Sequence, residues 1–333
     1  ADGNTAVGHE SLKANTTGAR NVAIGQGALD ANTTGQKNVA VGWGALSDYN
    51  VTDSGDDFNV AVGYAALNQT TDSVALTAVG GKALELNTTG SNNTACGFQA
   101  LYSNTTGERN TGIGTYSAYS TTTGERNTAV GMYSLYTNTT GQRNDAFGYQ
   151  TLYSNTTGNY NTAYGYNALN ANTTADENTA FGYKALYVNT TGTNNVAVGS
   201  GALDANTTAQ HNVAVGKGAL TSATTGGYNT AIGGDTLAVN TTAAGNTAVG
   251  FAALDANTTG DFGTAVGYNA LTSNTTASSN VGVGYNAGQD ATTGSQLVLI
   301  GTDAGKNITT GARNTMLGYQ AGDDLTTGSD NIC

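Results

Sequence analysis

Few residues of this 333-residue chain are of the types that carry catalytic or metal chemistry. The sequence contains two His and two Cys. His9 and His211 are far apart and occupy different columns of the internal repeat described below, so we expect solvated surface residues rather than one shared site. Cys96 stands where other copies of the repeat have Val or Ile, and we expect a small core residue. The chain is therefore predicted to be no enzyme and to need no cofactor.

One acidic segment could hold a cation. Asp53, Asp56 and Asp57 lie close together in the sequence D-S-G-D-D, and carboxylate oxygens are ligands that Ca²⁺ prefers. The segment lacks the regular ligand spacing and the terminal Glu of an EF-hand. A solvated loop is the favoured interpretation, and calcium binding is the alternative.

Glycosylation is the chemistry that the sequence offers most often. Asn-x-Ser/Thr without Pro is the acceptor pattern for N-glycosylation, and we count 16 matches. Twelve matches belong to a recurring Asn-Thr-Thr motif: Asn15, Asn32, Asn87, Asn104, Asn138, Asn155, Asn172, Asn189, Asn206, Asn240, Asn257 and Asn274. The other four are Asn50, Asn68, Asn92 and Asn307. All 16 are candidate glycan sites.

The Asn-Thr-Thr motif has other interpretations. Asn and Thr are good turn residues, so one turn copied many times creates the acceptor pattern automatically. The Thr pair persists where the Asn is lost, as at Thr122–Thr123 and Thr309–Thr310. The hydroxyl groups therefore cap the turn, form ladders between copies, or carry O-linked glycans. The row of Thr also resembles the flat face of evenly spaced Thr in ice-binding solenoids. Ice binding is therefore a lesser alternative.

An internal repeat spans the whole chain. The motif Asn-Thr/Val-Ala-Val-Gly first occurs at Asn4 and last at Asn314, with 19 copies at steps of 17 residues and one step of 21. The consensus is N-T-A-V-G-Y-x-A-L-x-x-N-T-T-G-x-x, and positions 1–17 denote its residues. Position 5 is always Gly, which indicates a turn with positive φ or a close backbone approach. The first eight of these turn glycines are Gly8, Gly25, Gly42, Gly63, Gly80, Gly97, Gly114 and Gly131.

The period predicts an all-β fold, a parallel β-solenoid (β-roll) of 19 coils of 17 residues. Helix-pair repeats need about 33 residues, and the β-branched, Gly and turn residues disfavour helix. We expect about two short strands per coil. Because side chains alternate along a strand, positions 2 and 4 should face inward with Leu at position 9, and Ala at position 3 should face outward. Asn at position 1 should form a hydrogen-bonded ladder, and Tyr at positions 6 and 10 should stack along the coils.

We expect residues 1–333 to form a single continuous solenoid with two departures from the pattern. Residues 51–58 contain a four-residue insertion and should form a loop. In residues 280–333, Ala-Gly replaces Ala-Leu, with Gly288, Gly305 and Gly322 at position 9. The cross-section of these coils must narrow or repack.

Charge and hydropathy limit the partners. The net charge is −12 with only 11 Lys and Arg, which disfavours nucleic acid because it needs clustered basic residues. No stretch approaches the roughly 20 apolar residues that span a bilayer. Only 10% of the residues are charged, so we expect covalent glycans to keep such a surface soluble.

The repeat resembles those of known fibrous proteins. N-T-A-V-G and N-V-A-I-G, followed three residues later by Ala, resemble the S-x-A-I-G-x-x-A repeats in head domains of trimeric autotransporter adhesins. Residues 314–322, N-T-M-L-G-Y-Q-A-G, are similar to the N-T-A-I-G-Y-Q-A repeats of phage tail fibres and other fibrous surface proteins. The resemblance implies a parallel β-roll that is often left-handed, trimeric and extracellular. The 17-residue period and the recurring N-T-T-G depart from that pattern.

The leading functional hypothesis is a structural subunit of an extracellular fibre or filament, assembling end to end and coated with glycans on its Asn-Thr-Thr turns. The alternative is a receptor-binding or adhesive shaft of a trimeric adhesin or a phage tail fibre. The expected partners are further copies of the chain, as an end-to-end homopolymer or a homotrimer. The expected location is extracellular, or the surface of a cell or virion.

Overall fold

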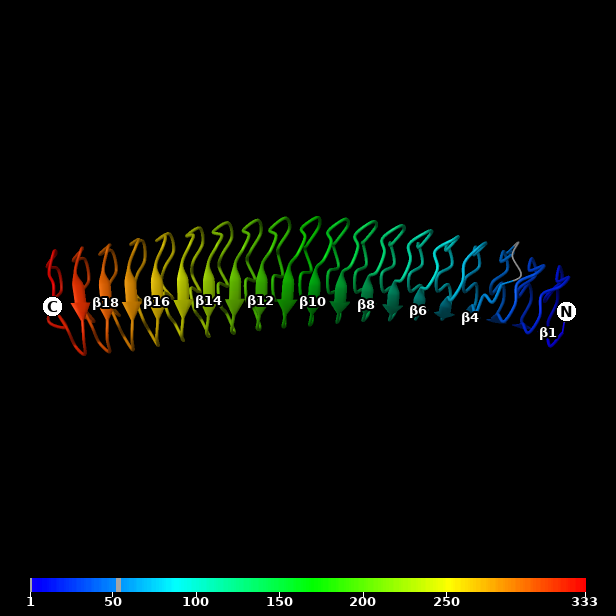
Figure 1. The fold of residues 1–333 in the computed structure, drawn as a ribbon, viewed down its shortest axis with the longest axis horizontal. Coiled ribbons are helices and arrows are strands. Elements are labelled where there is room, and N and C mark those ends of the chain that lie inside the picture. The colour runs from blue at the N-terminus through cyan, green and yellow to red at the C-terminus, as the bar shows by residue number, and fades with distance from the viewer. Residues whose placement is uncertain (1, 52–54) are drawn as a thin grey trace. The chain divides into compact units, whose positions relative to one another are not determined.

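The computed structural model describes residues 2–51 and 55–333. These residues form strands and turns and contain no helix, so none of them provides a helix that could cross a membrane. The chain divides into two compact units, residues 1–164 and 165–333. Each unit is a parallel β-solenoid in which every copy of the repeat forms one coil (Figure 1). The prediction of an all-β, parallel β-solenoid is confirmed.

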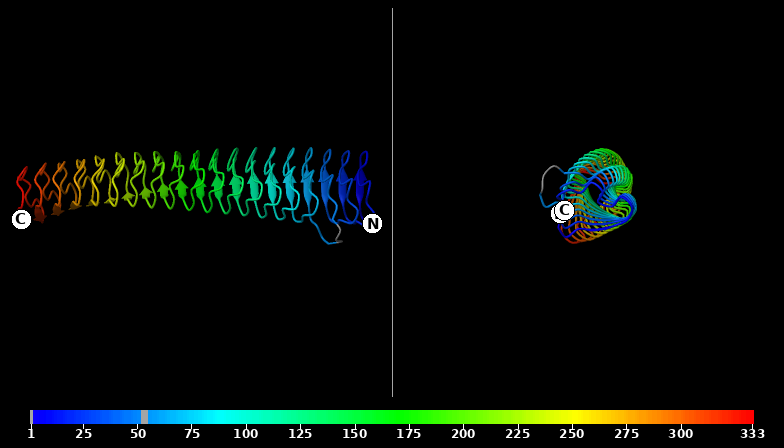
Figure 2. Two further views of the ribbon diagram at one scale, coloured as in Figure 1. Left: turned by 90° about the horizontal axis from the view of Figure 1, so that it is seen from above. Right: turned by 90° about the vertical axis from the view of Figure 1, so that its right-hand side faces the viewer.

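Each coil contributes one strand of three residues, at positions 2–4. The first unit contains β1 (Thr5–Val7), β2 (Val22–Ile24), β3 (Val39–Val41), β4 (Val60–Val62), β5 (Thr77–Val79), β6 (Thr94–Cys96), β7 (Thr111–Ile113), β8 (Thr128–Val130), β9 (Asp145–Phe147) and β10 (Thr162–Tyr164). The second contains β11 (Thr179–Phe181), β12 (Val196–Val198), β13 (Val213–Val215), β14 (Thr230–Ile232), β15 (Thr247–Val249), β16 (Thr264–Val266), β17 (Val281–Val283), β18 (Val298–Ile300) and β19 (Thr315–Leu317). Within each unit, neighbouring strands pair in parallel and in register, so equal positions lie side by side (Figure 2).

The described coils do not contain the second strand that we expected. Positions 7 and 9 have positive φ, for example 59° at Lys82 and 51° at Leu84, and this left-handed conformation interrupts an extended segment. The backbone still bonds to the next coil there. The amides of Leu84 and Leu86 donate to the carbonyls of Ala100 and Tyr102 at 3.0 and 3.1 Å. This wall of the solenoid is therefore a stack of hydrogen-bonded turns.

The two faces of the strand are the reverse of our expectation. Ala at position 3 is buried, as at Ala95 and Ala197, and positions 2 and 4 point outward, so that Phe181 is 50% exposed. The reason is the narrow interior, which positions 3, 8 and 9 must share. A methyl group fits between the strand and the Leu of position 9, and a larger side chain there would overlap that Leu.

The coils of residues 280–333 also show that the side-chain volumes at positions 3 and 9 depend on each other. Where position 9 becomes Gly305 or Gly322, position 3 becomes Leu299 or Met316, and both larger side chains are fully buried. A Cβ on Gly305 would lie 2.6 Å from a methyl carbon of Leu299. In the coils that begin at Leu297 and Asn314, the expected repacking is therefore an exchange, in which the large side chain moves from position 9 to position 3. In the coil that begins at Asn280 both positions are Gly, and the side chains of Leu271 and Leu299 from the neighbouring coils lie close to Gly288. Gly also adopts the positive φ of position 9 more readily than Leu does.

Two asparagine columns hold the interior together. In the coil that starts at Asn21, the amide nitrogens of Asn21 and Asn32 both donate to the carbonyl of Gly35, at 2.8 and 3.2 Å. The side-chain oxygen of Asn21 accepts from the backbone amide of Asn38 in the next coil at 2.9 Å. The predicted ladder at position 1 is confirmed, and the polar groups bind both within and between coils. Buried amides are otherwise costly, so this pairing is what allows Asn inside the coil.

The glycines at position 5 fulfil both predictions made for them. Their φ values lie in the positive region, from 123° at Gly114 to 144° at Gly182. A Cβ on Gly25 would lie only 2.4 Å from the carbonyl oxygen of Gly42, the equivalent residue of the next coil. Each coil therefore needs Gly here for its own turn and for its contact with its neighbour.

Candidate functional site

Most of the candidate N-glycosylation sites are buried. Eleven of the twelve Asn residues in the Asn-Thr-Thr motif, all except Asn15, have at most 1% of their surface exposed. Their amide nitrogens are hydrogen-bonded, as in Asn104, which donates to Asn87 at 2.7 Å and to the carbonyl of Gly107 at 3.0 Å. A glycan on that nitrogen would pull the side chain out of the interior. Burial therefore argues against a glycan at these eleven positions, because the Asn closes the coil, and glycosylation there stays a prediction.

The remaining candidates lie nearer to the surface. Asn50, Asn92 and Asn307 are exposed, while Asn15 and Asn68 are partly exposed. The amide nitrogen of Asn68 donates to Ser47 and to the carbonyl of Gly44, both at 3.0 Å. Exposure therefore favours the glycan prediction at these five positions, which do not form a continuous row.

The two Thr residues of the motif have different roles. At position 13, the hydroxyl group donates to the backbone carbonyl of the next Thr in the column, as from Thr105 to Thr122 at 3.1 Å and from Thr122 to Thr139 at 3.1 Å. This ladder accounts for the persistence of Thr where the Asn is lost. At position 14 the side chain is turned to solvent, as at Thr106 and Thr123. The predicted hydroxyl ladder is therefore confirmed for the first Thr of the pair.

The acidic segment does not assemble a calcium site in the described residues, where no group of three metal-ligating side chains occurs. Asp53 lies outside the described residues. Asp56 forms an ion pair with Lys37. Asp57 is only 3% exposed and accepts hydrogen bonds from the backbone amide of Gln36 at 2.6 Å and from the side chain of Asn38 at 3.1 Å. Asp57 thus acts as an interior acceptor, in the role that the position-15 carbonyl has in other coils.

The main outward feature of each unit is the strand face, which we define as positions 2, 4 and 6. Position 4 is apolar in every copy, and position 6 is often aromatic. Ile113, Phe181 and Ile232 are 41%, 50% and 41% exposed. The aromatic side chains stack from coil to coil, as Tyr166 does on Tyr183 with ring centroids 5.6 Å apart. Each unit therefore has a continuous row of partly exposed apolar side chains.

The strand face is almost uncharged. Among the 19 copies, only Asp145 and Lys217 have a full charge at positions 2, 4 or 6, although the chain has a net charge of −12. Cys96 lies on this face as an exposed free thiol, and the prediction of a core residue is wrong because position 4 points outward. Contiguous apolar surface of this kind marks interaction sites in other proteins. The strand face is our principal candidate site.

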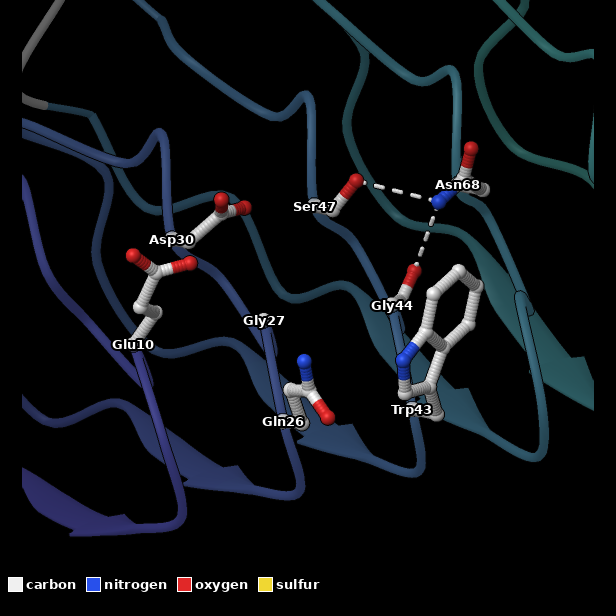
Figure 3. A pocket seen from close by; sticks show the side chains of 8 residues that line it. All are labelled: Glu10, Gln26, Gly27, Asp30, Trp43, Gly44, Ser47 and Asn68. Carbon is white, nitrogen blue, oxygen red and sulfur yellow. Dashed lines mark hydrogen bonds between the residues drawn. The ribbon is translucent and has the colours of Figure 1, made fainter.

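A second candidate is a hollow in the first unit, about 180 Å³ in volume. It lies where position 7 is Gly27 in one coil and Gly44 in the next, because neither has a side chain to fill the space (Figure 3). Glu10 and Asp30 lie at one end, and the indole of Trp43 lies at the other (Figure 3). The shape and the mixed polar lining suit only a small molecule or one side chain.

The electrostatics of the hollow are those of an acidic surface. Burial raises the pKa of the Asp30 carboxyl above its usual range, and the negative charges of Asp48 and Glu10 raise it further. Glu10 is engaged by Lys13, with an Nζ–Oε1 distance of 2.8 Å. Trp43 is stacked on Tyr64, with ring centroids 4.9 Å apart, so one face of the indole is covered.

His9 and His211 belong to different units. His9 lies 3.9 Å from Glu10 at the surface of the first unit, and His211 stacks on Tyr228 in the second, with ring centroids 4.9 Å apart. The predicted surface location is confirmed for both.

The side chains of Glu108 and Arg109 form an exposed ion pair with an N–O distance of 3.7 Å. Such a surface pair contributes little stability.

Sequence reasoning missed the strand face, although the columns contained a signal for it. Position 3 is Ala or Gly in 17 of the 19 copies, which indicates a restricted space, whereas position 4 ranges from Val to Phe and Tyr. A column that tolerates such different volumes is typical of an open surface.

No model of a known protein family matches the chain, and no curated protein matches it.

Proposed function

We propose that the chain is a structural shaft module of an extracellular fibre, and that copies associate side by side through the strand face. In this proposal the residues of the interior columns stabilise the coil, and the residues of the strand face bind a second copy of the chain. The proposal adopts the shaft hypothesis in place of the glycan-coated filament, since the buried Asn side chains weaken the argument for a coat.

The observation that carries the proposal is the exposed apolar ladder at positions 4 and 6. Removing apolar surface from water contributes about 25 cal/mol per Å², and here an apolar side chain recurs at position 4 of every copy of the repeat and an aromatic one at position 6 of many. A contact of modest strength at one coil is therefore multiplied along the face. Monomeric soluble proteins rarely expose so long an apolar row.

A second copy is the partner that fits this face best. Its strand face has the same coil-to-coil spacing, so a contact formed at one coil can recur at the next. The face also carries few charges, so two chains of net charge −12 meet there with little local repulsion. A partner without this period could not match more than a few coils.

Paired substitutions test the proposal. Ile113→Glu with Ile232→Glu places a charge on the strand face of each unit, and Thr123→Glu with Thr242→Glu places one on the exposed position 14 of the same coils. We expect sedimentation to show oligomers for the parent chain and for the Thr variant, and at least about a tenfold weaker association for the Ile variant. A parent chain that is monomeric at all concentrations, or equal association of the two variants, would refute the proposal.

The finer features remain part of the proposal. These are a left-handed coil, a trimeric cross-section, continuity of the solenoid through residues 1–333, and a location on a cell or virion surface. End-to-end assembly would use the same coil-to-coil hydrogen bonds that join neighbours within each unit. Electron microscopy of the purified chain distinguishes long filaments from short bundles of side-by-side copies.

Ice binding is a second candidate, and the strand face rather than the turn now favours it. Position 2 is Thr or Val in 18 of the 19 copies, and its side chain points outward beside the aliphatic side chain of position 4. These two columns form a regular array on the strand. Thermal hysteresis in the parent chain that disappears in a variant with Thr94→Lys and Thr111→Lys would support this function, and no hysteresis would exclude it.

A further inference from the structure

Four tyrosines of the first unit form a stacked ladder at position 10. They belong to four consecutive coils and are Tyr102, Tyr119, Tyr136 and Tyr153. The ring centroids of consecutive members are 5.1, 5.2 and 5.2 Å apart, and the ring planes differ by 5°, 15° and 9°. Each ring of the ladder is partly exposed. The two inner rings therefore have a parallel phenol on either side.

A second, shorter ladder lies against the first. Tyr116 and Tyr133, at position 7, stack with centroids 5.3 Å apart and planes 7° apart. Their rings meet those of Tyr119 and Tyr136 edge to face, at centroid distances of 5.7 and 5.5 Å. The six rings form one network, which we call the tyrosine tract. The network is a feature of this region, because position 10 is Tyr in only one other copy of the repeat.

We propose that the tyrosine tract is a site of oxidative coupling, in which dityrosine bonds join consecutive coils. A one-electron oxidant such as a haem peroxidase removes one electron and one proton from each of two phenols. The two phenoxyl radicals combine through ring carbons ortho to the oxygen, and each of these carbons then passes its hydrogen to the adjacent oxygen to restore the ring. With hydrogen peroxide as the terminal oxidant, two tyrosines and one peroxide give one dityrosine and two waters.

The ladder geometry favours this reaction within the chain. Coupling in solution requires two short-lived radicals to meet, whereas the solenoid holds the two rings in contact, which raises their effective concentration greatly. Offset parallel rings about 5 Å apart place the ortho carbons of neighbouring rings near one another. Partial exposure allows an electron-transfer oxidant to reach the network. Each bond would join residues 17 positions apart and so fasten one coil to the next.

The second unit provides a natural control in the same column. Tyr187 also lies at position 10, but its neighbours in that column are Asn170 and Asp204. Its ring lies beside the ammonium group of Lys184, 5.0 Å from the centroid. Tyr187 therefore has the same place in the coil as the ladder tyrosines and lacks a phenol to couple with in its column.

The experiment treats the full-length chain, diluted to limit encounters between molecules, with a haem peroxidase and limiting hydrogen peroxide. Dityrosine is detected by its fluorescence, and peptide mass mapping locates the bonds. We expect linked peptides that join Tyr102 with Tyr119, Tyr119 with Tyr136, and Tyr136 with Tyr153, each lacking two hydrogen atoms. The same bonds should make the first unit more resistant to denaturant than before treatment.

Matched variants separate the ladder from general oxidation. Tyr119→Phe with Tyr136→Phe keeps the stacked rings and removes the phenols, so all three linked peptides should disappear while circular dichroism stays unchanged. Tyr187→Phe should leave them at the parent level. The proposal is overturned if the three linked peptides do not form in the parent chain, or if the bonds form mainly between molecules.

Discussion

The inner and the outer columns of the coil both contain many apolar residues, but they differ in the side-chain volumes that they accept. Inside, Ala, Leu and Asn fill a narrow space in which each column depends on its neighbours, so Leu at position 3 occurs only where position 9 is Gly. Outside, the strand face accepts Val, Ile, Phe, Tyr and Cys in a single column. The difference teaches that restricted volume, rather than hydrophobicity, identifies the interior of a small solenoid.

The comparison predicts the largest loss of stability at position 5. Gly131→Val forces a β-branched residue to a φ of 129°, and its Cβ would lie 2.4 Å from the carbonyl oxygen of Gly148. We expect the free energy of unfolding to fall by about 4 kcal/mol or more. Gly27→Ala is the control, because its φ is 64° and a Cβ there meets nothing within 4 Å. Similar losses in urea denaturation for both variants would mean that the coil-to-coil contact is unimportant.

The next largest effect is expected from overfilling the interior. Ala129→Leu adds a large side chain at position 3 beside Leu135 at position 9, and should destabilise the chain by about 3 kcal/mol. Adding Leu135→Gly recreates the arrangement of Leu299 with Gly305 and should restore most of the loss. A double variant no more stable than the single one would contradict the exchange between the two positions.

Loss of one interior amide should cost somewhat less. Asn127 donates to the carbonyl of Gly141 at 2.8 Å and accepts from the backbone amide of Asn144 at 3.0 Å. Asn127→Ala leaves the buried backbone amide of Asn144 without an acceptor, while the carbonyl of Gly141 keeps its hydrogen bond from Asn138 at 3.1 Å. We expect about 2 kcal/mol of destabilisation. Thr128→Ala, at the adjacent outward position 2, should change stability by less than about 0.5 kcal/mol. If denaturation shows equal losses of stability for the two variants, position 1 is no more important to the interior than the outward position 2.

The smallest effect concerns the buried carboxyl of the insertion. Burial raises the pKa of Asp57 above its usual value, although the hydrogen bonds from Asn38 and Gln36 partly oppose the shift. The folded chain therefore holds the proton more tightly than the unfolded chain, and stability falls as the pH rises from the ordinary value of about 3.9 through the raised pKa. Asp57→Asn should flatten this part of the curve of unfolding free energy against pH. An unchanged slope would show that Asp57 does not titrate there.

Much of the fold could be predicted from the sequence. The 17-residue period and the invariant Gly of position 5 led to the β-solenoid and to its turns, because both follow from backbone constraints that every copy must meet. The Asn ladder and the stacking of Tyr102 on Tyr119 followed from the rule that equal positions lie side by side.

The direction of the side chains could not be obtained from alternation alone. Either face of a three-residue strand satisfies the pattern, and Val at position 4 looked more like a core residue than Ala at position 3. The positive φ of Leu at position 9 also gave no sequence signal, since Leu rarely adopts it. The first of these errors placed Cys96 in the core.

The thiol of Cys96 tests the central claim most directly, because it lies on the strand face and the exposed thiol of Cys333 provides an internal standard. We predict that Cys96 reacts readily with a maleimide in dilute solution and about tenfold more slowly at concentrations where copies associate side by side, while this association leaves the rate for Cys333 unchanged. A Cys96 that is unreactive at every concentration would show that position 4 faces inward. A rate that does not depend on concentration would show that the strand face remains uncovered.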